Sequence, residues 1–155
     1  MKEQVLAVQR MQDYIEANKT EEISLSDLAR ASLFSPWYSY RLFRDCLGLT
    51  PTEYIRKYRL TQAAKQLRSG DVKVIDAAMD AGFTNVDTFT RAFYREFGLN
   101  PSDYTKNPVP ITFFIPYGAK YRELRKENID VSNIQPIFIQ VAGAPVYHQA
   151  RQTSR

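Results

Sequence analysis

The chain has 155 residues, of which 44% are hydrophobic, and Lys plus Arg outnumber Asp plus Glu by 21 to 17. This hydrophobic content is enough for the core of one ordinary domain and part of another. The net charge of +4 suits an anionic partner without requiring one. The single cysteine, Cys46, excludes an internal disulfide and a multi-cysteine metal site, and is expected to be a small buried hydrophobe. No apolar run approaches the ~20 residues of a membrane span. We therefore predict a cytoplasmic protein.

The first third of the chain predicts helices. Residues 4–17 repeat apolar side chains at the spacing of one helix face, so an amphipathic opening helix is expected. A short second helix starts near Ser24 or Ser26. Ser35 followed by Pro36 is a cap with proline at the first helical position, so a third helix begins there and ends just before a glycine.

A longer helix is expected over about residues 52–69, between Pro51 and Gly70. At 1.5 Å per residue it spans roughly 27 Å. Successive turns of the major groove along one face of a duplex lie ~34 Å apart, so a spacer of this size can present two helices to neighbouring turns. We expect each of its cationic side chains, taken singly, to be exposed to solvent. The alternative is that these side chains together contact phosphates.

The segment GFTNVDTFTRAFYREFGLNPSDY at 82–104 reads as a turn followed by a helix, and it has a near copy about fifty residues upstream. Asp27 matches Asp76 at a separation of 49, and Phe43 matches Phe93 at a separation of 50, so one residue is inserted in the second turn. Both copies close with the pattern Gly-x-x-Pro-x-x-Tyr. The sequence therefore predicts two copies of one helix-turn-helix unit.

The turn of the first copy departs from this pattern. Leu33 stands at the position that matches Gly82, where a left-handed backbone conformation favours glycine. We expect the first turn to be strained or shaped differently from the second.

The repeated segments resemble the AraC/XylS family of bacterial transcription regulators over roughly residues 22–104. The most specific segments are DAAMDAGFTN, TFTRAF and REFGLNPSDY in the second copy, and LSDLARAS, RLF and GLTPTEYI in the first. The resemblance implies an all-α fold in which two helix-turn-helix subdomains are joined by a long linker helix.

This resemblance also implies a domain plan. The DNA-binding domain is expected at 1–107, with helix-turn-helix units at about 24–48 and 74–98 and the linker helix at about 52–69. Residues 108–155 are expected to form a linker and a short α/β or irregular extension.

In each helix-turn-helix unit, aromatic residues of the second helix form one face that must be buried. The opposite face of that helix is free to contact DNA. In the family, the residues that match most of the candidates face bases or the nearby backbone. Arg44 and Arg95 complete the candidate set. The candidate DNA-binding residues are Trp37, Tyr40, Arg41, Arg44, Val86, Asp87, Thr88, Thr90, Arg91 and Arg95.

Alternatives to DNA contact exist for several of these residues. An exposed arginine ordinarily serves solubility, but Arg41 and Arg91 occupy repeat-related positions beside buried aromatics, which favours contact with guanine or phosphate. Asp87 can accept a hydrogen bond from cytosine or cap its helix, and capping is the favoured interpretation. Trp37 and Tyr40 either press on a thymine methyl or sugar, or pack against the first helix.

The composition changes after a linker at 107–110. ITFFI at 111–115 and PIFIQVA at 136–142 are β-rich apolar runs, separated by a charged and helix-prone segment. The segment from 108 to 142 resembles the beginning of a GyrI-like effector-binding domain. We expect this domain to be truncated and unable to form its pocket. The alternative is a short strand pair docked on the helical domain. The final residues, 146–155, carry no periodic pattern, and His148 has no partner there.

Catalytic signatures of the GxxxxGK, HExxH and GxSxG types are missing, so we expect no enzyme, no catalytic residue, no metal and no cofactor. The expected function is sequence-specific binding of double-stranded promoter or operator DNA by a nucleoid-associated transcription activator, with no membrane partner. A monomer should suffice, because one chain holds both reading helices. Two alternatives remain open: a ligand sensor built on the extension, and an interaction module whose second unit contacts RNA polymerase.

Overall fold

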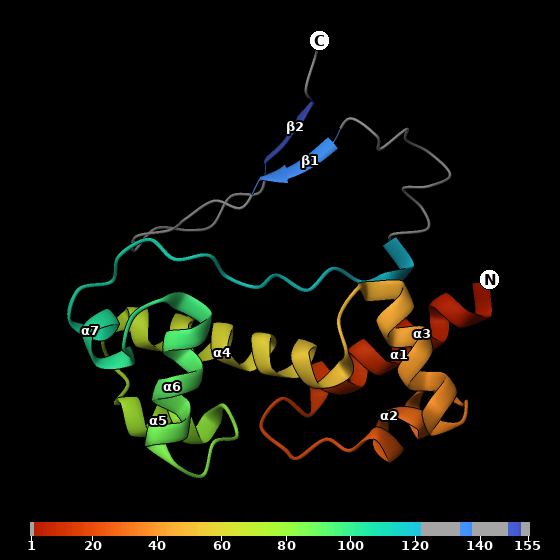
Figure 1. The fold of residues 1–155 in the computed structure, drawn as a ribbon, viewed down its shortest axis with the longest axis horizontal. Coiled ribbons are helices and arrows are strands. Elements are labelled where there is room, and N and C mark those ends of the chain that lie inside the picture. Colours follow the sequence, from red (N-terminus) through yellow and green to blue (C-terminus); the bar gives the residue numbers. More distant parts are fainter. Residues whose placement is uncertain (1, 122–133, 138–148, 153–155) are drawn as a thin grey trace. The chain divides into compact units, whose positions relative to one another are not determined.

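The computed structural model describes residues 2–121, 134–137 and 149–152. The chain divides into two compact units (Figure 1). Unit 1 consists of residues 1–56 and 116–131, and unit 2 consists of residues 57–115 and 132–155. Within the described range 2–121, the chain passes from one unit to the other at 56/57 and again at 115/116. None of the helices in the described part of the chain is both long and apolar enough to span a bilayer.

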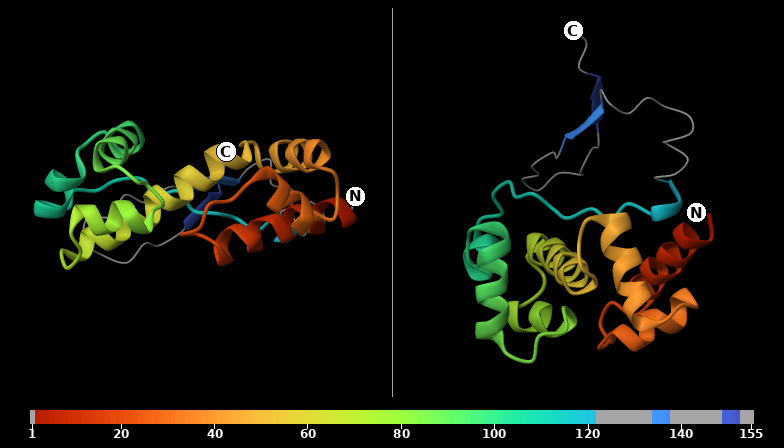
Figure 2. Two further views of the ribbon diagram at one scale, coloured as in Figure 1. Left: turned by 90° about the horizontal axis from the view of Figure 1, so that it is seen from below. Right: turned by 45° about the vertical axis from the view of Figure 1, so that its right-hand side comes forward.

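Unit 1 begins with α1 (Lys2–Ala17), which is followed by α2 (Leu25–Ser32) and α3 (Pro36–Leu47). It ends in the first turns of α4 (Pro51–Ser69), the long helix that continues into unit 2. In Figure 2 the short α2 and the longer α3, both orange, cross one another after a tight turn. This is the arrangement of a helix-turn-helix unit.

The core of unit 1 follows from the apolar face of α1 and one aromatic side of α3. Val8, Met11 and Ile15 are buried, as the spacing of apolar residues in this helix predicts. Phe43 of α3 is fully buried and meets the ring of Tyr54 edge to face, with ring centroids 5.1 Å apart. The outward side of α3 is thereby fixed.

The first turn is left-handed at a leucine. Leu33 has φ 68° and ψ 21°, and its side chain is 76% exposed. The hydroxyls of the buried Ser32 and Ser39 lie 2.6 Å apart and link α2 to α3 across this turn. At the matching positions of unit 2 stand Ala81 and Phe89, which meet by apolar packing instead. The expectation of strain in the first turn is confirmed by the positive φ of Leu33.

Unit 2 continues α4 and adds α5 (Val74–Asp80), α6 (Val86–Phe97) and α7 (Pro101–Lys106). A two-stranded antiparallel ladder, β1 (Ile134–Ile137) with β2 (Gln149–Gln152), belongs to the same unit. The predicted all-α fold of two helix-turn-helix subdomains, one long linker helix and a short mixed extension is confirmed.

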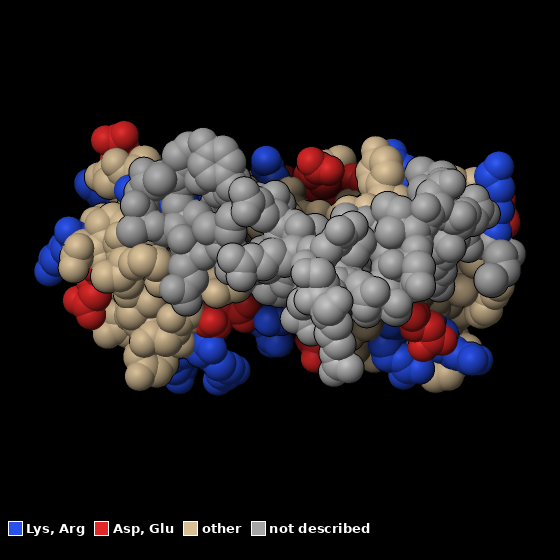
Figure 3. Space-filling view, turned by 90° about the horizontal axis from the view of Figure 1, so that it is seen from above, with Lys and Arg blue, Asp and Glu red and all other residues tan. Residues whose placement is uncertain are grey.

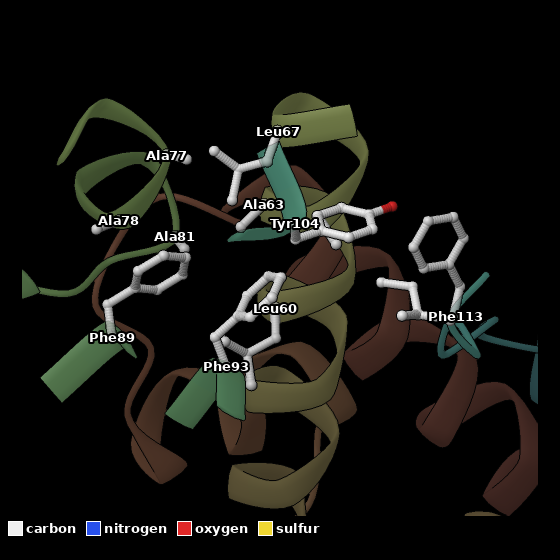
Figure 4. Close-up of a cluster of buried hydrophobic side chains, with 12 residues drawn as sticks. Leu60, Ala63, Leu67, Ala77, Ala78, Ala81, Phe89, Phe93, Tyr104 and Phe113 are labelled. Atoms are coloured by element: carbon white, nitrogen blue, oxygen red, sulfur yellow. The ribbon is translucent and has the colours of Figure 1, made fainter. Parts of the chain in front are cut away.

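The core of unit 2 is built on the aromatic stripe of α6. Phe89 and Phe93 are fully buried, and Figure 4 shows Phe93 beside Tyr104. The ring centroids of Phe97 and Tyr104 lie 4.7 and 5.9 Å from that of Phe93. Small side chains of α4 and α5 let the aromatic rings approach these helices closely. The buried cluster is Leu60, Ala63, Ala64, Leu67, Ala77, Ala78, Ala81, Phe89, Phe93, Tyr104, Ile111 and Phe113.

Residues 111–115, which the sequence predicts to be a strand, do not form one in the structure. Residues 112–118 have no regular secondary structure, although Ile111 and Phe113 are buried in the core of unit 2. Alternate side chains of an extended segment are therefore buried against helices, which gives the same sequence pattern as a strand. We call residues 108–121 the strap; it is the teal trace that follows α7 in Figure 1.

The last part of the chain is only partly described. β1 overlaps the start of the predicted run 136–142, whose residues from 138 onward lie outside the described part. β2 falls in the final segment, which carries no periodic pattern. It pairs with β1 in the register Ile134 with Gln152 and Ile137 with Gln149. Most of the predicted effector-like region, and His148, also lie outside the described residues, so the GyrI-like resemblance stays a prediction.

Replacing Leu33 by glycine should stabilise the protein by about 1 kcal/mol, because the left-handed conformation costs a leucine roughly 1–2 kcal/mol and little buried surface is lost. Chemical denaturation measures the change in unfolding free energy. The matched control is Gly82→Ala, where φ is 82° and a Cβ would come within 2.9 Å of the Arg59 guanidinium, so stability should fall. Equal stability of Leu33→Gly and the wild type would contradict a strained first turn.

Phe93→Ala should lower the unfolding free energy by about 3–5 kcal/mol, because it leaves a cavity at the centre of the unit 2 core. Thermal and urea unfolding report this loss. A protein that melts as before but no longer binds DNA would show that the buried and outward faces of α6 have been interchanged.

Candidate nucleic-acid interface

The first helix with an outward polar face is α3. Ser35 caps it by accepting a hydrogen bond from the Tyr38 N–H, and Pro36 occupies its first turn. Burial of Phe43 on one side turns Arg41 and Arg44 to the other, where both are exposed. The structure thus places the predicted arginines of the first copy on the solvent side of a rigid helix.

Two aromatic residues accompany these arginines. The ring of Trp37 is stacked on that of Tyr40 at 6.4 Å with an interplanar angle of 9°, and Trp37 is 68% exposed. It is the neighbouring Tyr38 that bonds to α1, by accepting a hydrogen bond from the Gln4 amide at 2.7 Å. The exposed Trp37 ring, supported by the partly buried Tyr40, offers an apolar surface that can meet a thymine methyl or a sugar.

The corresponding helix of unit 2 is α6. Asn85, rather than Asp87, caps it: the Asn85 side-chain oxygen accepts from the N–H groups of Asp87 and Thr88 at 2.7 and 3.3 Å. The interpretation of Asp87 as the cap is therefore wrong. The amide of asparagine reaches two donors from the position just outside the helix, which leaves the Asp87 carboxylate exposed in the first turn.

The remaining candidates of α6 lie along its outward side. Thr88, Arg91 and Arg95 are exposed, whereas Val86 and Thr90 are partly buried. An open hollow of about 610 Å³ brings three predicted residues together with two others. It is lined by Thr90, Arg91, Tyr94, Arg95 and Asn100.

Tyr94 and Asn100 are absent from the predicted set. Tyr94 is 56% exposed and follows Thr90 by one helical turn, and the helix period places it on the same outward side. Asn100 comes from the loop before α7, and a local sequence pattern gives no sign that this loop approaches α6. A phenol, an amide and two guanidiniums around one hollow supply hydrogen-bond donors that suit phosphate or base-edge acceptors.

Cationic side chains of α4 in unit 2 have partners inside the unit. Lys57 pairs with Glu96 at 3.1 Å, and the cations of Lys65 and Arg68 lie 6.0 and 5.5 Å from the centroid of the Phe113 ring. Three of the cationic side chains of the linker helix therefore make contacts inside the unit. In unit 1, Arg44 lies 3.3 Å from Asp45, an exposed pair that contributes little to stability.

Two groups with displaced pKa values belong to the scaffold. The pKa of Asp27 is lowered, first by the hydrogen bond from the Ser24 N–H, then by the Ser24 hydroxyl and Arg30. This reciprocal bonding is a capping box at the start of α2. Burial raises the pKa of the Tyr104 phenol, and Arg68 opposes the rise. On the face drawn in Figure 3, the described Lys and Arg side chains lie among Asp and Glu, so net charge alone does not locate the interface.

Two helix-turn-helix units, each with an outward polar face on its second helix, define a DNA-binding protein of the double helix-turn-helix class. A family model described as a helix-turn-helix domain matches residues 28–107. The chain belongs to the AraC/XylS family of transcription regulators, as the resemblance of its repeats predicted.

Three similar proteins illustrate this membership. The regulatory protein SoxS of Salmonella typhimurium is 38% identical over 97 residues, which cover 63% of this chain and 91% of SoxS. The transcriptional activator AarP of Providencia stuartii is 37% identical over 91 residues, which cover 59% of this chain and 67% of AarP. The crystal structure of a probable AraC family regulator from Rhodopseudomonas palustris superimposes with a TM-score of 0.59 at 29% identity, covering 64% of this chain and 94% of that one.

Proposed function

We propose that this DNA-binding transcription regulator is a sequence-specific activator that inserts α3 and α6 into two major-groove segments of one duplex site. Arginine and short polar side chains on the outward faces read base edges, and the flanking cations hold phosphates. The relatives SoxS and AarP support regulation, and the name of AarP supports activation.

The observation that carries this proposal is the equivalence of the two outward faces. Arg41 and Arg91 occupy the same position of the repeat, each is exposed, and each precedes by two residues a fully buried phenylalanine. Solubility alone does not require a cation at the same position of both copies. A common role in contacting DNA accounts for it.

Several properties follow from the same proposal. One chain holds both reading helices, so a monomer binds an asymmetric site. The protein acts in the cytoplasm, associated with the nucleoid. Division into a DNA-binding domain at 1–107 and an extension at 108–155 belongs to the proposal as well.

Arg91→Ala should lower specific affinity by about 1–3 kcal/mol and relax the preference at one or two base pairs, because a bidentate contact is lost. Arg95→Ala should weaken binding more evenly across sequences and reduce the slope of log affinity against log salt by about 1. Selection of sites from a random duplex pool, followed by anisotropy titration at several salt concentrations, measures both effects.

Lys19→Ala is the control for loss of one positive charge, because Lys19 is exposed in the turn after α1 and lies outside the candidate set. It should leave sequence preference unchanged. An Arg91→Ala protein that selects the same bases as the wild type would remove Arg91 from the base-reading role.

A second candidate function, contact with RNA polymerase, is supported by the exposed face of α5. Ile75 and Met79 are 51% and 64% exposed, and Asp76 and Asp80 lie beside them on the helix. Carboxylates repel phosphates, so this face suits a protein surface with apolar and basic groups better than it suits DNA. At the matching positions of unit 1 the residues are Ser26 and Arg30, so the fold does not demand apolar side chains there.

Ile75→Gln combined with Met79→Gln should reduce activation of a reporter promoter severalfold while leaving operator affinity unchanged. Transcription in vitro with purified polymerase and anisotropy titration with the same promoter DNA separate the two effects. Full activation by the double variant would exclude this face as the contact.

A further inference from the structure

The strap is anchored in unit 2 by burial and by its main chain. Ile111 and Phe113 are 5% and 4% exposed and belong to the core of that unit. The Phe114 N–H donates to the Thr61 hydroxyl oxygen at 2.9 Å, and Thr61 itself is buried in α4. The strap is therefore attached to unit 2 by two buried side chains and by one main-chain hydrogen bond (Figure 4 shows Phe113).

Five residues further along, the strap is anchored in unit 1 by the side-chain amide of Gln12. The Gln12 amide nitrogen donates to the Tyr117 carbonyl at 3.1 Å, and its oxygen accepts from the Ala119 N–H at 2.8 Å. The same nitrogen lies 3.1 Å from the Tyr54 hydroxyl. Gln12 is only 6% exposed, so loss of the strap would leave a buried amide with fewer partners, which is costly.

The neighbouring Gln9 adds a second main-chain contact. Its side-chain oxygen accepts from the Lys120 N–H at 3.2 Å. A Cβ at Gly118 would meet the same oxygen at 2.9 Å and the Tyr121 ring at 3.1 Å, so glycine permits the close approach of the strap to α1. Gln9 and Gln12 together form what we call the glutamine clamp.

The strap lies outside the family model that matches this chain. The matching helix-turn-helix model ends at residue 107, before the strap begins. Among residues 2–121, the chain runs between the units once through α4 and once through the short stretch from Phe114 to Ala119. The second connection is held on each side by contacts inside a unit.

We propose that the strap is a second restraint on relative movement of the two units, and that Gln12 is a positioning residue which makes the restraint hold. This inference rests on the proposed insertion of both recognition helices into one duplex. A restraint that narrows the range of separations raises the effective concentration of the second helix once the first has bound. We call the bases read by one recognition helix a block. With the strap in place, a duplex with both blocks is bound more tightly than a duplex with one block, and by a larger factor than α4 alone would produce.

The test lengthens the strap without changing either anchor. Six Gly and Ser residues are inserted between Ile115 and Pro116 of the full chain. Affinities are measured for duplexes carrying both blocks of the selected site or one block with the other scrambled. Because effective concentration falls about as the −3/2 power of tether length, the ratio of two-block to one-block affinity should fall roughly threefold. One-block affinity should not change.

The matched control inserts the same six residues between Asn107 and Pro108, which adds equal length outside the anchored stretch. It should keep the wild-type ratio. Equal ratios for both insertions would overturn the strap inference while leaving the proposed function intact. A wild-type protein with no preference for two blocks over one would overturn insertion of both helices, and the strap inference with it.

Hydrogen exchange tests the anchor without DNA. In the wild type, the amides of Phe114 and Ala119 should both be protected. Gln12→Leu should release the Ala119 amide, while Phe114 stays protected in unit 2, and should lower the affinity ratio as the insertion does. Rapid exchange at Ala119 in the wild type, or an unchanged ratio in Gln12→Leu, would overturn the role of Gln12.

Discussion

Burial of one aromatic side of α3 and α6 is the constraint on which the rest of the structure depends. Phe43 and Phe93 are fully buried at matching positions, and a helix that buries one side must present the other to solvent. The orientation of Arg41 and Arg91 is therefore a consequence of core packing. A substitution that disturbs the buried side of either helix should therefore also disturb the orientation of its outward arginine.

The helices of the two units are held together by different kinds of side-chain contact. Unit 1 joins its helices through the hydroxyls of Ser32 and Ser39, whereas unit 2 packs Phe89 against small side chains. A buried hydroxyl pair contributes less than a buried aromatic ring. The first turn also carries a left-handed leucine. Both differences weaken the junction between α2 and α3 relative to its counterpart in unit 2.

Sequence alone predicted the parts of this fold that local periodicity and repetition determine. The 49 and 50 residue offsets located both helix-turn-helix units, and the stripes of phenylalanine identified the buried faces. Patterns failed where distant parts of the chain meet. The alternation of Ile111 and Phe113 resembles a strand, but helices bury it, and the bonds of Gln12 to residues more than a hundred positions away leave no local signature. Asn100 in the hollow was missed for the same reason.

The glutamine clamp has a consequence for how the strap can evolve. Gln9 and Gln12 bond to main-chain groups, and a main chain offers the same groups whatever its side chains. The side chains at the exposed positions 117 and 120 can therefore vary, whereas position 118 must stay small and the buried Ala119 leaves little room for a larger side chain. Proline, which lacks an N–H, is barred from positions 119 and 120. Homologous straps would be recognised by spacing and by the two glutamines of α1, with little identity of their own.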